Sequence, residues 1–154
     1  MKKLNVVRSL LVGAAIPSLL MVTSGSASAD GYGITWRNGK TGNYLTAYYN
    51  GKVGDDAHYQ GESDWNDIEN SDGTWNEVNV HLGQCLTGYY AQVYTENCNS
   101  GTNGTNSWER WYEWPTSTGW ELKNVETGYI LDDDGYDNVY ANSTDWANSN
   151  QRWH

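Results

Sequence analysis

The sequence predicts an all-β fold built from three similar units. Three observations carry this prediction: no segment keeps an apolar period of 3.6 residues, short runs of Val, Ile, Tyr and Trp alternate with turn residues, and one pattern recurs about every 42 residues. The turn residues are Gly, Asn, Asp and Thr, which is typical of short strands joined by tight turns. The chain is therefore expected to contain many strands and no long helix.

The recurring pattern is an asparagine, a glycine four residues later and a leucine three residues after the glycine. It occurs as "NGKTGNYL", "NVHLGQCL" and "NVETGYIL", which contain Leu45, Leu86 and Leu131. A valine follows each leucine, at Val53, Val93 and Val139. The three leucines are expected to occupy equivalent positions in one core.

Each unit is expected to end in a triplet of a polar, an intervening and an apolar residue: "NDI", "ERW" and "QRW". The last residues of these triplets, Ile68, Trp111 and Trp153, should form a second layer of the core. A unit of about four short strands cannot bury its apolar side chains alone, so three units should close around a shared centre. A propeller has blades of similar length but needs at least four of them. The sequence therefore predicts a β-trefoil with three pseudo-symmetric repeats of about four strands each.

The first 29 residues have the pattern of a secretory signal peptide. Three basic residues precede the apolar run "LLVGAAIPSLLMV", and the small-residue stretch "SGSASAD" follows it, with cleavage expected before Asp30. The run is too short and too interrupted to predict a membrane span. Residues 30–154 are expected to form one secreted domain, with repeats at roughly 31–73, 74–115 and 116–154.

Composition limits the kind of partner. The chain carries 19 acidic and 9 basic residues, a formal net charge of −10, which disfavours a nucleic-acid partner. Cys85 and Cys98 are the two cysteines of a chain expected in an oxidising compartment, so a disulfide between them is predicted. The three histidines show no ligand spacing, and no metal site or cofactor is expected.

The three repeats, their Q-x-W-like triplets and the cysteine pair resemble the ricin B-type β-trefoil lectins. The third repeat, "NVETGYILDDDGYDNVY" with its closing "NQRW", resembles still more closely the actinohivin-like lectins of high-mannose glycans. The resemblance covers essentially all of residues 30–154 and is strongest over 120–153. It implies a secreted lectin without catalytic activity, with mannose-containing glycans as partners.

In lectins of this kind, a repeat can present a shallow pocket made by an aspartate after the core leucine, a tyrosine after the valine and an amide residue further on. A carboxylate can accept from two adjacent sugar hydroxyls, the ring covers the C–H face of the sugar, and the amide selects a hydroxyl orientation. The resemblance assigns these roles in the third repeat to Asp132, Tyr140 and, at the amide position, Asn142, Asp145 or Trp146.

The other two repeats depart from that pattern. The second has Tyr94 and Asn99 but carries Thr87 in place of the aspartate, and the first has Thr46 and Gly54 where Asp and Tyr belong. We therefore expect one complete site, one partial site and one lost site. Because a single shallow sugar pocket binds weakly, useful affinity would need a larger glycan or an oligomer.

The remaining acids near the third site are expected to be solvated hairpin residues: Asp133, Asp134 and Asp137. Calcium binding by Asp132, Asp134 and Asp137 stays an alternative, although the closing glutamate of an EF-hand loop is missing.

Two further function classes remain open. Paired carboxylates can hydrolyse a glycoside, but the sequence has neither G-x-S-x-G nor H-E-x-x-H and no cysteine expected to be free, so no enzyme is predicted. The alternative is a protein-binding trefoil, such as a hydrolase inhibitor, or an accessory glycan-binding subunit of a secreted glycosidase or toxin.

Overall fold

The computed structural model describes residues 31–99 and 106–154, so the expected signal peptide lies outside the described residues. The described part consists of short strands and three 3₁₀ helices, which confirms the prediction of an all-β fold. The strands are β1 (Gly31–Ile34), β2 (Tyr44–Ala47), β3 (Val53–Asp56), β4 (Trp65–Glu69), β5 (Trp75–Asn79), β6 (Gln84–Tyr89), β7 (Gln92–Asn97), β8 (Trp111–Thr116), β9 (Gly119–Asn124), β10 (Ile130–Asp133) and β11 (Val139–Asn142). The 3₁₀ helices are η1 (Gly61–Ser63), η2 (Ser107–Glu109) and η3 (Ser149–Gln151).

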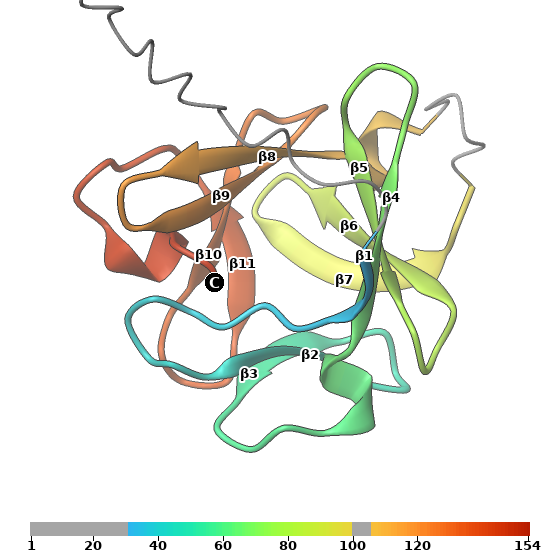
Figure 1. Ribbon diagram of the computed structural model, residues 1–154, viewed down its shortest axis with the longest axis horizontal. Coiled ribbons are helices and arrows are strands. Elements are labelled where there is room, and N and C mark those ends of the chain that lie inside the picture. The colour runs from blue at the N-terminus through green and yellow to red at the C-terminus, as the bar shows by residue number, and fades with distance from the viewer. Residues whose placement is uncertain (1–30, 100–105) are drawn as a thin grey trace, which may run out of the picture.

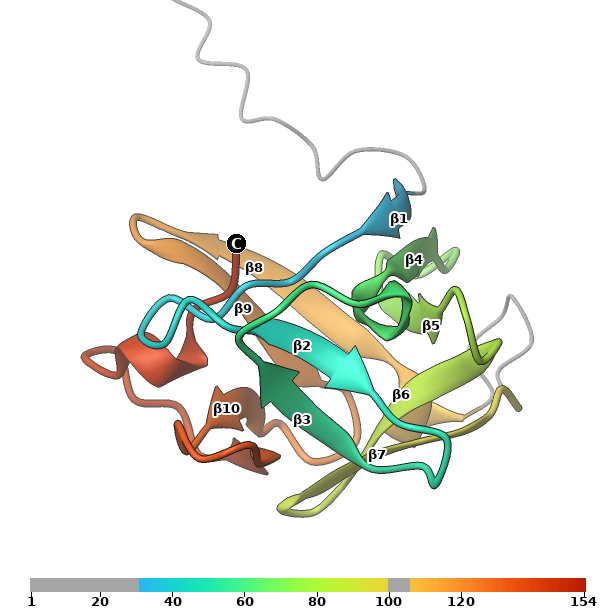
Figure 2. The ribbon, with the colours of Figure 1, turned by 90° about the horizontal axis from the view of Figure 1, so that it is seen from below.

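The strands form three lobes around one centre (Figure 1). Nine strands pair antiparallel in the order β1-β4-β5-β6-β7-β11-β10-β9-β8, and a further pairing of β5 with β8 closes the sheet on itself. The β2–β3 hairpin forms its own small sheet. Figure 2 shows the β2–β3 hairpin at the centre of the view, with β1 above it and β10 on its left. Three hairpins around a closed set of strands are the architecture of a β-trefoil.

The core repeats the same two residue types three times. The leucines predicted to be equivalent are all fully buried, as are three tryptophans: Leu45, Leu86, Leu131, Trp65, Trp111 and Trp153. In each unit the tryptophan Nε1 donates to the carbonyl oxygen of the leucine, at 2.9, 2.9 and 3.1 Å. Each bond satisfies the one polar atom of a buried indole, so a large ring can fill the centre without leaving an unpaired donor.

The first unit corrects one expectation. Ile68 lies on β4, half-buried, and the residue equivalent to Trp111 and Trp153 is Trp65. The closing triplet of the first unit is therefore "SDW", not "NDI". Ser63, the last residue of η1, lies two positions before Trp65. The last residues of η2 and η3 lie two positions before Trp111 and Trp153 in the same way.

The three pattern asparagines join the units to one another. In each, Oδ1 accepts from two backbone N–H groups of the turn that follows, for example those of His81 and Leu82 on Asn79. Each Nδ2 donates to a carbonyl beside the 3₁₀ helix of the preceding unit: Asn79 to Glu62, Asn124 to Trp108 and Asn38 to Asn150. Because Asn38 of the first unit bonds to the third unit, these contacts form a closed ring.

The predicted disulfide is confirmed. Cys85 on β6 is bonded to Cys98, just beyond the end of β7, with the two Cα atoms 5.0 Å apart. The bond ties together the two strands of the second hairpin. In the described part of the chain, no helix has the length and apolarity needed to cross a membrane.

Candidate functional site

The third hairpin brings together three of the residues predicted for the complete site. Asp132 and Tyr140 are directly opposite each other on β10 and β11, and Asn142 follows two residues later on the same face of β11. Tyr140 is half-buried and Asn142 is exposed. Burial and the charge of Asp132 raise the pKa of Tyr140, so its ring carries a neutral hydroxyl at physiological pH.

Asp132 itself is fully buried and bonded within the protein. Its Oδ2 accepts from Gln151 Nε2 at 2.9 Å and from Asn148 Nδ2 at 3.2 Å, and its Oδ1 accepts from the backbone N–H of Asp133 at 2.9 Å. A sugar hydroxyl reaching this carboxylate would have to share it with Gln151 and Asn148. The role of Asp132 in sugar binding stays a prediction. Its hydrogen bonds to Gln151 and Asn148 hold η3 against the hairpin.

Asp145 is linked to the same group through Gln151. The backbone N–H of Asp145 donates to Gln151 Oε1 at 2.9 Å, while its exposed carboxylate accepts from the backbone N–H of Ala147. Gln151 thus ties the loop after β11 to Asp132. The backbone of Asp145 therefore contacts the edge of the site, whereas its carboxylate bonds within its own loop.

The second unit has the equivalent geometry with different side chains. Tyr94 lies opposite Thr87 on the β6–β7 hairpin, as Tyr140 lies opposite Asp132. Glu109, the last residue of η2, is buried and accepts from the backbone N–H of Asn99 at 3.0 and 3.1 Å. Asn99 and Asp145 are therefore in equivalent positions, as the repeat alignment indicated.

In the first unit, another loop fills the space that the tyrosine of this pattern would occupy. Gly54 lies opposite Thr46, and a Cβ atom at Gly54 would lie 2.7 Å from Asp137 Oδ1. Asp137 comes from the tip of the third hairpin, where its Oδ2 pairs with Lys52 Nζ at 2.9 Å. The Asp137 loop therefore covers the position where a tyrosine would present its ring to a ligand.

Two of the three acids expected to be solvated have structural partners. Asp133 is fully buried, accepts from Thr41 Oγ1 at 3.0 Å, and has its pKa raised by burial, so the expectation of a solvated acid is wrong for it. Asp137 is exposed but holds the ion pair with Lys52 of another unit. The expectation of a solvated acid holds for Asp137 and for Asp134, which is exposed and bonded to the backbone N–H of Tyr136. The carboxylates of this hairpin thus point to separate partners and do not converge on one cation.

A cleft between β7 and β11 joins the second and third units. Its volume is about 470 Å³, and both predicted tyrosines, Tyr94 and Tyr140, line it. The other lining residues are Ala91, Gln92, Val93, Asn138 and Val139. Tyr140 also pairs with Gln92 across the two strands. Residues of two repeats that the sequence assigned to separate sites therefore share one cleft.

Sequence reasoning missed Gln92 and Asn138 as lining residues. Each immediately precedes the core valine of its unit, in the triplets "QVY" and "NVY", whereas the first unit has "KVG". The available signal in the sequence was an amide side chain directly before the valine in both of the units that keep the tyrosine. Amide groups both donate and accept, so the cleft offers two aromatic rings and two groups able to bond hydroxyls.

An aromatic cluster lies beside the second unit. Tyr89 and Tyr90, at the tip of the β6–β7 hairpin, pack against Trp108, with ring centroids 4.9 and 5.6 Å from that of the indole. Both tyrosines remain exposed. Tyr90 has a positive φ of 52°, an unfavourable backbone conformation that turns its ring onto the indole. The cluster adds an apolar surface near the cleft.

Comparison with known proteins supports the fold. No protein-family model matches the chain, and no curated protein does. Among solved structures, a designed threefold-symmetric protein, ThreeFoil, is 19% identical with a TM-score of 0.68, over 80% of this chain and 95% of ThreeFoil. An endo-β-galactosidase from Clostridium perfringens that releases GlcNAcα1-4Gal gives the same identity and TM-score, over 80% of this chain and 31% of that chain.

A third similar structure is the cytolethal distending toxin of Haemophilus ducreyi, 19% identical with a TM-score of 0.64, over 78% of this chain and 80% of that chain. At these identities the similarity concerns the fold. Together with the three hairpins and the repeated core, it establishes the chain as a β-trefoil protein.

Proposed function

We propose that the protein binds carbohydrate, without catalysis, at the cleft between β7 and β11. The observation that carries the proposal is that Tyr94 and Tyr140, equivalent residues of two units, line this cleft together with Gln92 and Asn138. An aromatic ring covers the apolar face of a sugar, and amides bond its hydroxyl groups. The cleft combines both requirements in residues that the described fold holds on paired strands.

The similar structures support this choice. One of them is an enzyme that releases the disaccharide GlcNAcα1-4Gal, and its similarity to this chain covers about a third of its length. The resemblance of the repeats to ricin B-type lectins points in the same direction. The finer part of the proposal, mannose-containing glycans, rests on the likeness of "NVETGYILDDDGYDNVY" to actinohivin-like lectins.

A glycan array followed by calorimetric titration tests the proposal. Tyr140→Ala and Tyr94→Ala are each expected to weaken binding about tenfold, the loss of one ring contact. Tyr32→Ala is the matched control, because Tyr32 is 74% exposed on β1 and lies outside the cleft. Thermal unfolding of each variant separates a lost contact from a lost fold.

The array, a protease panel and an assay for released sugar decide between the alternatives. A blank array with inhibition of a protease panel would identify a protein-binding trefoil in place of a lectin. Release of reducing sugar from a bound glycan would contradict the absence of catalysis. Binding that survives both tyrosine substitutions would keep the class of protein and reject the cleft as its site.

Secretion is part of the proposal, with cleavage before Asp30. The disulfide between Cys85 and Cys98 supports it, since such bonds persist in oxidising compartments. Expression of the full chain in a secreting host should give an extracellular protein whose intact mass corresponds to a chain starting at Asp30. An intact amino terminus on the extracellular protein would contradict this.

A further inference from the structure

Three carboxylates from three strands, two of them buried and one half-buried, meet near β1. They are Asp67 on β4, Glu77 on β5 and Glu113 on β8, and each offers an oxygen within 4.8 Å of the other two. Asp67 and Glu77 are directly opposite each other in the β4–β5 ladder. Like charges in opposite positions of a ladder repel, so this arrangement is costly unless something compensates it.

The protein leaves these carboxylates only partly satisfied. Glu77 is fully buried and Asp67 is 8% exposed. Trp36 Nε1 donates to Glu77 Oε2 at 3.0 Å, but three buried oxygens have no hydrogen-bond partner: Asp67 Oδ1, Glu77 Oε1 and Glu113 Oε1. Within residues 31–99 and 106–154, none of the ion pairs involves any of the three carboxylates.

Burial makes the charged forms expensive. It raises the pKa of Glu77 well above its usual range and the pKa of Glu113 to about 7, and for Glu77 the charge of Asp67 adds to the effect. A buried carboxylate is stabilised by a paired cation, by a coordinated metal or by taking up a proton. Within the described residues no ion pair supplies the cation, so a metal and a proton compete for this cluster.

We infer that Asp67, Glu77 and Glu113 bind a divalent cation, with calcium as the fitting ion. Calcium takes carboxylate oxygens at about 2.3–2.6 Å, so two of its ligands can lie up to about 5 Å apart, which accommodates the 4.8 Å of this cluster. Magnesium needs about 2.0–2.1 Å and a tighter set of oxygens. Glu113 is half-buried, so water can reach the ion and complete its coordination.

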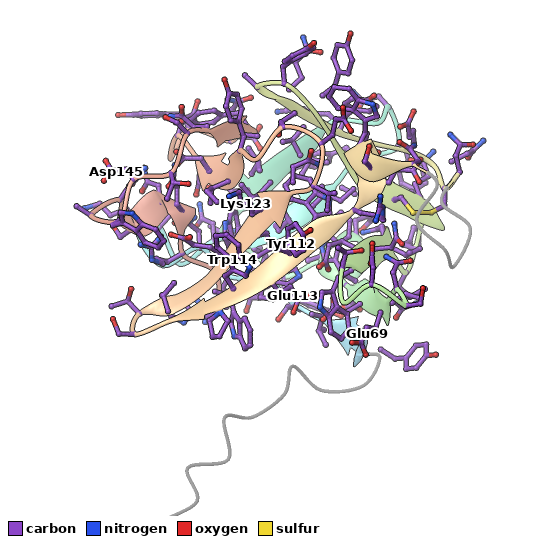
Figure 3. All side chains as sticks on the ribbon, turned by 90° about the horizontal axis from the view of Figure 1, so that it is seen from above. Glu69, Tyr112, Glu113, Trp114, Lys123 and Asp145 are labelled. Atoms are coloured by element: carbon purple, nitrogen blue, oxygen red, sulfur yellow. A yellow bond between two sulfur atoms is a disulfide. The ribbon has the colours of Figure 1, made fainter. Side chains whose placement is uncertain are left out.

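The cation site is separate from the cleft proposed to bind carbohydrate. The two sites share no residue, and Figure 3 shows Glu113 and Glu69 toward one side of the molecule, with Asp145 at the opposite edge. Asp67 and Glu77 follow Trp65, the end of the first unit, and so belong to the second unit, whereas Glu113 follows Trp111 and belongs to the third. A bound cation would therefore join two units through their side chains.

Thermal unfolding and calorimetric titration with calcium test the inference. Calcium at about 10 mM should raise the midpoint by about 3–5 °C over the value in EDTA, as expected for dissociation constants near 10⁻³ M. Titration should give one calcium per chain, and magnesium should give a smaller shift. Glu113→Gln, which keeps the shape and removes a charge, should reduce the calcium shift below about 1 °C.

Asp134→Asn is the control, because Asp134 lies in the other acidic group, on the third hairpin. This variant should keep the calcium shift of the unchanged protein. The midpoint of Glu113→Gln in EDTA shows whether that variant folds, and Asp67→Asn repeats the test on another strand. No calcium shift in the unchanged protein, or an undiminished shift in both carboxamide variants, would overturn the inference. Loss of the calcium shift in Asp134→Asn alone would also overturn the inference, because it would assign the bound calcium to the third hairpin.

Discussion

The carboxylate of Asp132 shows how one side chain can serve the fold and the candidate site together. It accepts from Gln151 and Asn148, and so holds η3 against the third hairpin, directly beside Tyr140. The first unit makes the equivalent contact with Thr46 and Ser63, whose hydroxyl oxygens are 2.9 Å apart. In the first and third units, the residue after the core leucine therefore bonds the 3₁₀ helix of its unit, whether or not that unit binds a ligand.

Asp132→Ala should lower the free energy of unfolding by about 2–3 kcal/mol, because it leaves one of the two N–H groups of the buried Gln151 amide without an acceptor, while the other still donates to the Ser143 carbonyl. Chemical denaturation measures this change. Asp134→Ala, at an exposed position two residues away, should cost less than about 1 kcal/mol. Equal losses in the two variants would show that Asp132 has no special structural role.

Trp65 and Ile68 provide a second test at this scale. Trp65→Ala removes a fully buried ring and should cost about 3–5 kcal/mol, whereas Ile68→Ala, at a half-buried position on β4, should cost under about 1.5 kcal/mol. Denaturant midpoints of the two variants give the comparison. A greater loss for Ile68→Ala would restore the triplet "NDI" as the end of the first unit.

At the level of elements, the repeated pattern predicted the hairpins and most of the core but not the spacing between them. The leucine and the tryptophan it bonds are 20, 25 and 22 residues apart in the three units. Equal spacing of the repeats pointed to Ile68 as the counterpart of the two later tryptophans. The connection before η1 is shorter than in the other units, and the repeat period does not reveal this. The burial of Asp133 was equally hidden, since it depends on Thr41 from another unit.

The cleft could be predicted only in part for the same reason. The sequence identified Tyr94 and Tyr140 within their own repeats, but their meeting depends on the pairing of β7 with β11. Contacts between units have no local signature in a chain of similar repeats. The lost pocket of the first unit was predicted from Gly54, and its physical cause, the Asp137 loop, again comes from another unit.

The second hairpin depends on its disulfide. Replacing both Cys85 and Cys98 by serine should lower the free energy of unfolding by about 3 kcal/mol, the chain-entropy value for a loop of this length. Denaturation of the double variant measures the loss, and reduction of the unchanged protein with a thiol is the control. A loss below about 1 kcal/mol in both cases would show that the β6–β7 hairpin is held by its other contacts.

For the whole molecule, the arrangement of the units predicts how many glycans the proposed cleft can bind. The first unit has Gly54 under the Asp137 loop, while the second and third units contribute one tyrosine each to a single cleft. Titration with a glycan identified on the array should therefore give one binding site per chain. Two equivalent sites, each lost with a different tyrosine, would contradict a shared cleft. Since one shallow site binds weakly, light scattering should accompany the titration, because an oligomer would raise the avidity.

The ring of contacts made by Asn38, Asn79 and Asn124 has a consequence for cooperativity. In a linear array of repeats, an end unit can unfold while its neighbours stay intact. Here every unit both gives and receives such a contact, so none is an end unit. Calorimetric unfolding should show one transition in which the measured enthalpy equals the van 't Hoff enthalpy. Separate transitions would mean that the units are independent, whereas a single one would make the trefoil indivisible, melting as a whole when any one of its three joints is opened.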